Sequence, residues 1–157
     1  MSIRFATRAD LGTIDTLIRA LAEYERLSDQ VTMDRQELGD YLFGERRFAE
    51  VLIAEEQSVA AGFALFFHNF STFLGKPGIY LEDLFVLPDK RGLGVGRALL
   101  KRLAEVAVER GCGRLEWAVL DWNLDAIGFY ERLGAQPNSD WTVYRLAGDG
   151  LRILASG

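Results

Sequence analysis

The segment between residues 80 and 100 constrains the fold most, because it runs from an apolar strand through a glycine-rich turn into an amphipathic helix without a break. The first amides of a helix lack intrahelical acceptors, and the helix dipole places partial positive charge beside them. Gly92, Gly94 and Gly96 have no Cβ, so the turn can adopt positive φ and approach a ligand oxygen closely. The segment therefore predicts an anion site, and its alternative is an ordinary tight strand-to-helix turn.

Basic residues surround this turn, and their spacing excludes two common phosphate loops. A dinucleotide fingerprint would need a third glycine where Arg97 stands, and a Walker A loop would need Gly-Lys followed by Ser or Thr, which is absent. The spacing present is Arg-x-x-Gly-x-Gly, which begins at Arg91, with Lys90 beside it. These three charges favour phosphate as the anion.

Length and composition indicate one domain spanning residues 1–157, since 49% hydrophobic residues suffice for a sizeable core. No apolar run approaches the roughly 18 residues that a membrane span requires, and the first residues do not read as a secretory leader. We therefore expect a soluble, cytoplasmic protein with no membrane partner.

Cys112 is the one cysteine and His68 the one histidine, which excludes an internal disulfide and a Cys/His zinc cluster. We expect no metal site. The net charge of -5 and the pI near 5.0 argue against a nucleic-acid partner and are compatible with a cationic small molecule.

Hydrophobic periodicity predicts that helices and strands alternate along the first half of the chain. A capping pair, Asp34 with Glu37, marks the start of the second helix. The predicted strands are residues 3–6, 51–54 and 59–67, and the predicted helices are 9–26 and 35–43.

The second half continues the alternation. The helix after the anion turn should stop at Gly111, and Asn123 should cap a later helix that ends at Gly134. Between these two helices we predict a strand at residues 114–120, and after them strands at 141–146 and 151–154.

This order of elements, together with the Arg-x-x-Gly-x-Gly spacing, resembles the GNAT superfamily of N-acetyltransferases along nearly the whole chain. The resemblance implies an α/β (α+β) fold with a mixed, mostly antiparallel sheet of about seven strands, flanked by about four helices. In that family the fourth and fifth strands splay apart and leave a V-shaped cleft.

The resemblance implies acetyl-coenzyme A as cosubstrate. Its pantetheine arm would pair with the backbone of the fourth strand, and its diphosphate would lie at the anion turn. Asn123 and Ala126 would lie on the far side of the coenzyme. The cofactor-binding residues implied in the strand and turn are Leu84, Phe85, Val86, Arg91, Gly92, Leu93, Gly94, Val95, Gly96 and Arg97.

The same resemblance implies Tyr130 as a catalytic residue, and the chemistry of the acceptor adds Glu82, which lies beside the expected cleft. An alkyl amine has a pKa of about 10.4, so a carboxylate such as Glu82 is needed to accept its proton, directly or through a water. Tyr130 would donate a hydrogen bond or proton to the departing thiolate. The alternatives are a solvent-facing or ion-paired charge for Glu82 and a packed aromatic for Tyr130.

Three short segments narrow the family further. Residues 22–25 (Ala-Glu-Tyr-Glu), 80–83 (Tyr-Leu-Glu-Asp) and 121–123 (Asp-Trp-Asn) together resemble the diamine acetyltransferases, which include spermidine/spermine N-acetyltransferase. Residues 71–73 (Ser-Thr-Phe) and 119–123 are similar to the branch that acetylates thialysine, whereas the polyamine branch has Asp-Pro-Trp where Ser71 begins. A lysine-like amino acid is therefore favoured over spermidine.

The substrate would be a small cationic amine. The substrate-binding residues implied are Tyr24, Glu25, Glu82, Asp83 and Trp141. Polyamine and protein amines remain as alternative acceptors, and a non-catalytic acyl-coenzyme A sensor remains as an alternative of another class. The resemblance also implies a homodimer whose C-terminal strands contact or exchange between subunits.

Overall fold

The computed structural model describes all 157 residues, which form two compact units, Met1–Ala118 and Val119–Gly157. The first unit is built on one sheet with the strand order β1-β2-β3-β4-β5. Neighbouring strands are antiparallel except β5, which runs parallel to β4. The strands are β1 (Ser2–Phe5), β2 (Glu50–Glu56), β3 (Val59–Ser71), β4 (Lys76–Val86) and β5 (Leu115–Trp117).

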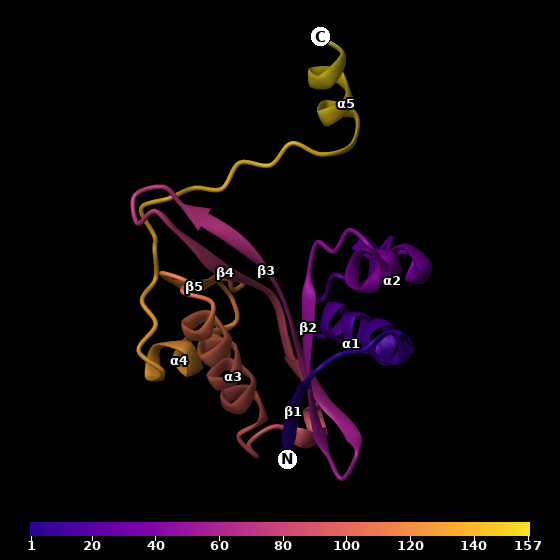
Figure 1. Cartoon of the computed structure of the whole chain (residues 1–157), viewed down its shortest axis with the longest axis vertical. Coiled ribbons are helices and arrows are strands. Elements are labelled where there is room, and N and C mark those ends of the chain that lie inside the picture. Colours follow the sequence, from indigo (N-terminus) through magenta and orange to yellow (C-terminus); the bar gives the residue numbers. More distant parts are fainter. The chain divides into compact units, whose positions relative to one another are not determined.

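Helices cover both faces of this sheet, with α1 and α2 on one face and α3 on the other (Figure 1). Side chains alternate along a strand, so successive residues of β2 and β3 supply the two core layers. The layer beneath α1 includes Val51, Phe63 and Phe85, and Leu17 is among the α1 residues that pack on it. The helices are α1 (Leu11–Tyr24), α2 (Arg35–Phe43) and α3 (Val95–Glu109), with 3-10 turns at Arg8–Asp10, Ser28–Gln30 and Pro88–Lys90.

Two predicted helix ends of the first unit, the start of α2 and the end of α3, are confirmed, whereas α1 is shorter than the predicted range 9–26. The side chain of Asp34 accepts from the backbone amide of Glu37 at 2.9 Å and caps α2. Gly111 has a φ of 71° after α3, and the next amide, that of Cys112, donates to the carbonyl of Ala107 at 2.9 Å. This pattern satisfies the last carbonyls of the helix and ends it there.

A β-bulge interrupts β4 at the position that matters most for the site. Phe66 of β3 lies opposite Leu81 and the preceding residue Leu65 lies opposite Asp83, so Glu82 is the extra residue of β4. An extra residue reverses which face the following side chains take. Asp83 and Phe85 therefore lie on the α1 face of the sheet, whereas Leu81 shares the opposite face with Phe66.

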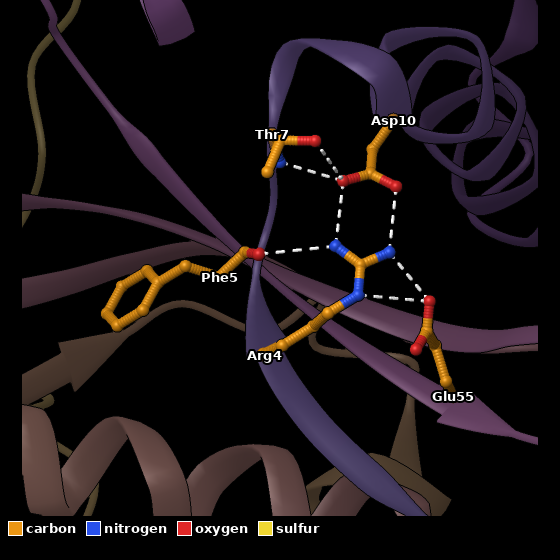
Figure 2. Close-up of polar contacts among 5 residues, drawn as sticks. All are labelled: Arg4, Phe5, Thr7, Asp10 and Glu55. Carbon is orange, nitrogen blue, oxygen red and sulfur yellow. Dashed lines mark hydrogen bonds and ion pairs between the residues drawn. The ribbon is translucent and has the colours of Figure 1, made fainter. Parts of the chain in front are cut away.

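One arginine joins β1 to both β2 and the turn before α1 (Figure 2). The Arg4 guanidinium donates to both carboxylate oxygens of Asp10, at 2.8 and 2.9 Å, and to Glu55 at 2.6 Å. These bonds hold the pKa of Asp10 at about 2, well below its usual value, although burial opposes the shift. Asp10 also accepts from the Thr7 amide at 2.7 Å, so the same carboxylate orders the chain entering α1.

A buried carboxylate joins α1 to α2. Asp15 is 3% exposed and accepts from Arg35 of α2 at 2.6 Å and from Arg19 of its own helix at 2.9 Å. Burial raises the pKa of Asp15, but the hydrogen bonds from the two arginines outweigh it and the net shift is downward. The α1–α2 pair is therefore oriented by charge as well as by its apolar face.

The second unit contains α4 (Leu124–Arg132) and α5 (Gly148–Ser156). Asn123 caps α4 as predicted, since its side-chain oxygen accepts from the Ala126 amide at 3.3 Å. Gly134 has a φ of 90°, and the amide of Ala135 donates to the carbonyl of Tyr130 at 3.2 Å. The predicted end of this helix is thus confirmed.

The two predicted C-terminal strands are wrong, and the sheet has five strands in place of about seven. Residues 141–146 contain no regular structure, and residues 151–154 belong to α5. Strands need a neighbour for their amides and carbonyls, and no strand of the chain pairs with either segment. The strand predicted at 114–120 is also shorter, because its pairing with β4 ends at Trp117.

A helix that crosses a membrane must be both long and poor in charge, and the structure contains none of that kind.

Candidate active site

The pairing of β4 with β5 ends at Leu81. The pairs between β4 and β5 are Ile79 with Leu115, Tyr80 with Glu116 and Leu81 with Trp117, and they stop there. The pairing stops because β5 ends at Trp117, so the expected splay of the fourth and fifth strands stays a prediction. Beyond Leu81, residues 82–86 keep β3 on one side and have no strand partner on the other, which leaves backbone groups at Leu84, Phe85 and Val86 for an extended ligand.

The glycine turn has the geometry of an anion site. Gly92 and Gly94 adopt left-handed φ values of 78° and 81°, and a Cβ at either position would meet open space. Gly94 is the N-cap of α3, and no side chain accepts from the first amides of that helix. Gly96 already lies within α3, so two of the three glycines supply the turn. The exposed amides fit the diphosphate of coenzyme A.

The basic residues of the turn differ in what they contact. Arg97 is exposed and forms no ion pair, so its charge faces solvent beside the turn. Lys90 lies 3.6 Å from Glu56. Arg91 turns away from the glycines: its Nε donates to the carbonyl of Val86 at 3.0 Å, and its guanidinium lies over the rings of Tyr24 and Phe85.

Three carboxylates interact at the end of α1. Burial, together with the charges of Glu82 and Glu25, raises the pKa of Asp83 to about 7. Burial also raises the pKa of Glu25. None of the three forms an ion pair or a side-chain hydrogen bond within the protein, and no basic side chain offsets their charge. The cluster is therefore suited to a cationic ligand.

Aromatic rings flank this cluster. Tyr24 ends α1 with 37% of its surface exposed, and Phe85 is 4% exposed, with ring centroids 6.2 Å apart. Sequence reasoning missed the Phe85 side chain and considered its backbone only. The available signal was spacing: Phe85 follows Asp83 by two residues on the same strand, so both side chains share a face.

The remaining predicted residues lie in the second unit. Asn123 and Ala126 form the cap of α4, and Tyr130 lies on that helix, half-buried, with its ring 5.5 Å from that of Phe129. Trp141 is 77% exposed. Tyr24, Glu25, Glu82, Asp83 and the glycine turn are thus brought together in the first unit, and the second unit presents the other four by itself.

The chain is similar to known proteins along nearly its whole length. The chain is 43% identical to a thialysine N-epsilon-acetyltransferase of Bos taurus, across 98% of this chain and 96% of the relative. It is 34% identical to an L-ornithine N5-acetyltransferase of Arabidopsis thaliana, across 97% and 86%. Among solved structures, an integron cassette protein from the mobile metagenome of V. cholerae superposes with a TM-score of 0.82 at 30% identity, covering 99% of this chain and 98% of the other.

The family match extends across both units. Residues 14–135 match the Acetyltransferase (GNAT) family, a range that includes the end of α1, the β4 edge, the glycine turn and α4. Members of this family use acetyl-coenzyme A, and the uncapped amides at Gly94 fit its diphosphate. The chain therefore belongs to the GNAT family of acetyltransferases and is an N-acetyltransferase.

Proposed function

We propose that the protein transfers an acetyl group from acetyl-coenzyme A to the side-chain amine of a small, lysine-like amino acid, with thialysine as the favoured acceptor. The observation that carries this proposal is the uncompensated cluster of Glu25, Glu82 and Asp83. Three carboxylates that repel one another and have no basic partner are stabilised by an ammonium group. The names of the relatives, which act on thialysine and ornithine, support an acceptor of this size.

The hairpin between β3 and β4 supports an amino acid over a polyamine. Ser71 stands at the position where the polyamine branch has an aspartate. Its side chain is buried at 6% exposure, and its hydroxyl accepts a hydrogen bond from the Leu74 amide at 3.2 Å. This position therefore contributes structure to the turn and no negative charge. The distal ammonium group of spermidine would therefore lack the carboxylate partner that an aspartate at this position would supply.

Glu82 is the proposed proton acceptor. The acceptor amine has a pKa of about 10.4, so making it neutral near pH 7 costs roughly 4 to 5 kcal/mol. Glu82 is exposed at the bulge, next to Asp83, and can take that proton directly or through a water. Asp83 and Glu25 would hold the ammonium beforehand, and Tyr24 would form an apolar wall for its alkyl chain.

The remaining groups would act on the coenzyme side. When bound, acetyl-coenzyme A supplies the acetyl group as a reactive thioester. The turn residues 91–97 would hold its diphosphate, the backbone of Leu84, Phe85 and Val86 would orient its pantetheine arm, and Asn123 and Ala126 would lie on its far side. As the amine forms the new C–N bond and the C–S bond breaks, Tyr130 would donate a proton to the leaving sulfur.

The test is release of free coenzyme A, followed with a thiol reagent, with acetyl-coenzyme A and one amine at a time: thialysine, lysine, ornithine, spermidine or putrescine. Fast release with thialysine and slow release with spermidine is the expected result. Fast release with spermidine alone would reverse the acceptor assignment. Tight coenzyme binding without release with any amine would favour a sensing module or a protein acceptor.

The proposal includes a homodimer. The segment 141–154 carries apolar side chains that this chain leaves uncovered, including Trp141 at 77%, Val143 at 88% and Tyr144 at 93% exposed. Pairing or exchange of this segment between two subunits would cover them, and Trp141 could then reach an acceptor site. Multi-angle light scattering should give twice the chain mass, and a monomer at micromolar concentration would contradict the dimer. We also propose that the protein acts in the cytoplasm.

A further inference from the structure

Arg91 occupies an unexpected place for a residue of the coenzyme turn. Its guanidinium carbon lies 4.6 Å from the centroid of the Tyr24 ring and 5.4 Å from that of Phe85. Both distances are within the roughly 6 Å over which a cation is attracted to an aromatic face. Its Nε donates to the carbonyl of Val86, whereas its terminal nitrogens have no acceptor. The side chain is exposed and can leave this position.

The rings under Arg91 are those beside the acidic cluster. Phe85 shares its face of β4 with Asp83, and Tyr24 immediately precedes Glu25. Aromatic faces next to carboxylates recognise alkylammonium groups. Arg91 is therefore an internal cation on a surface that suits the acceptor. It also holds the Val86 carbonyl, which belongs to the strand segment proposed for the pantetheine arm.

We propose that Arg91 is a coenzyme-operated gate: in the coenzyme-free protein its guanidinium covers the rings of Tyr24 and Phe85, and the diphosphate of bound coenzyme draws it away, so that the acceptor's ammonium takes its place. The acceptor part of this inference rests on the proposed function. The movement of Arg91 does not, because it concerns only the nucleotide and the side chain.

Physical chemistry favours the movement. A guanidinium forms charge-assisted, often bidentate hydrogen bonds with phosphate, which are about twice as strong as bonds between neutral groups. Its present partners are a neutral carbonyl and two ring faces. Arg91 directly precedes Gly92, where even an added Cβ would meet open space, so a diphosphate at the α3 amides would lie beside it. By linkage, nucleotide and acceptor each strengthen binding of the other.

The gate itself is tested without any acceptor. Side-chain NMR signals of Arg91, assigned with Arg91→Lys, should carry ring-current shifts that Tyr24→Leu removes. Adding adenosine 3′-phosphate 5′-diphosphate, which has the coenzyme's phosphates and lacks its pantetheine arm, should abolish these shifts while moving the amide signals of Gly92 and Gly94. Ring-shifted Arg91 signals that persist at saturation, or a nucleotide that leaves the Gly92 and Gly94 signals in place, would overturn the proposal.

Acceptor binding supplies the second arm, measured by calorimetric titration of thialysine with and without the same nucleotide. In the wild type the nucleotide should raise thialysine affinity about tenfold, as expected if the competent state is populated about one time in ten without it. Arg91→Ala should bind thialysine tightly in both conditions. Arg97→Ala is the matched control, because it removes a positive charge from the same turn but leaves Arg91 over the rings of Tyr24 and Phe85. Saturating nucleotide should therefore still raise the thialysine affinity of this variant about tenfold.

The two arms separate the gate from the proposed function. If the nucleotide raises the thialysine affinity of Arg91→Ala as much as that of the wild type, the gate proposal is overturned. If thialysine neither binds nor is acetylated, the assigned acceptor is wrong, and the NMR arm alone decides whether Arg91 moves.

Discussion

Asp83 lies opposite Leu65 in the β3–β4 register, and the bulge residue that precedes it has no partner in β3. This single offset turns the Asp83 carboxyl onto the face of the sheet that α1 covers, toward Tyr24 and Glu25. Burial and two neighbouring negative charges then raise its pKa to about 7. The charge of Asp83 therefore changes near neutral pH.

Thialysine binding should weaken as the pH falls through about 7, because the raised pKa of Asp83 means that its carboxylate is lost below that value. The ammonium of the ligand stays charged up to about pH 9 and does not compensate. Asp83→Asn should lower the affinity about tenfold at pH 8 and remove this dependence. Titration calorimetry of the coenzyme complex between pH 6 and 8 checks it. Glu23→Gln, which removes an unpaired α1 carboxylate, should keep the wild-type profile.

The same pKa has the opposite sign for stability. A carboxyl whose pKa is about 7 in the folded protein and about 3.9 when unfolded binds its proton more tightly in the fold, so the fold loses stability as the pH rises between these values. Asp83→Asn should therefore raise the Tm more at pH 8 than at pH 5. A Tm difference independent of pH would contradict the assignment.

Tyr130→Phe should lower kcat about ten- to a hundredfold while leaving the Kd of coenzyme A nearly unchanged, because the phenol acts on the departing sulfur. Single-turnover kinetics report the chemical step directly. Tyr41→Phe is the control, since Tyr41 lies on α2, outside the proposed site, and is 50% exposed. Equal single-turnover rates for wild type and Tyr130→Phe would remove Tyr130 from this role.

Gly94→Ala should weaken coenzyme binding, because a φ of 81° costs an alanine roughly 1 to 2 kcal/mol and the N-cap would shift to relieve it. Gly75 is a matched control, with a φ of 63° and equally open surroundings in the β3–β4 turn. Both substitutions should lower the Tm, and only Gly94→Ala should raise the Kd of coenzyme A. Equal Kd values for both variants would argue against the turn as the diphosphate site.

Acid stability should depend on Asp10. Its pKa of about 2 in the fold lies below the unfolded value, so its bonds with Arg4 stabilise the protein above about pH 4 and are lost as the pH falls through about 2 (Figure 2). The difference in unfolding free energy between wild type and Asp10→Asn should shrink over that interval in urea titrations. Asp29→Asn, which removes an exposed carboxylate without an ion pair, is the control for the loss of one negative charge.

Local signals explain what could be predicted from the sequence. Asp34, Gly111, Asn123 and Gly134 mark helix ends through caps that involve only a few neighbouring residues, and the structure confirms all four. The glycine turn is likewise a local motif. The bulge at Glu82 is different, because it depends on how two strands match in register, and alternation along β4 alone gives no sign of it.

The strand predictions for the two C-terminal segments were wrong for a related reason. Residues 141–146 have the alternation of a strand, yet alternation requires a neighbour, and this chain supplies none. Arg91 shows the same limit at the level of a side chain. Its motif predicts a phosphate partner, whereas its contact with Tyr24 joins residues of α1 and the coenzyme turn that only the tertiary fold brings together.

The ion pairs of Asp15 link α2 to the helix that ends at Tyr24. Asp15 and Tyr24 lie on one rigid helix, and Arg35 of α2 holds that helix through a 2.6 Å contact. A replacement at Arg35 would let α1 settle at a new angle and carry Tyr24 and Glu25 with it. We therefore expect a residue that never meets the amine to alter the surface proposed to bind it.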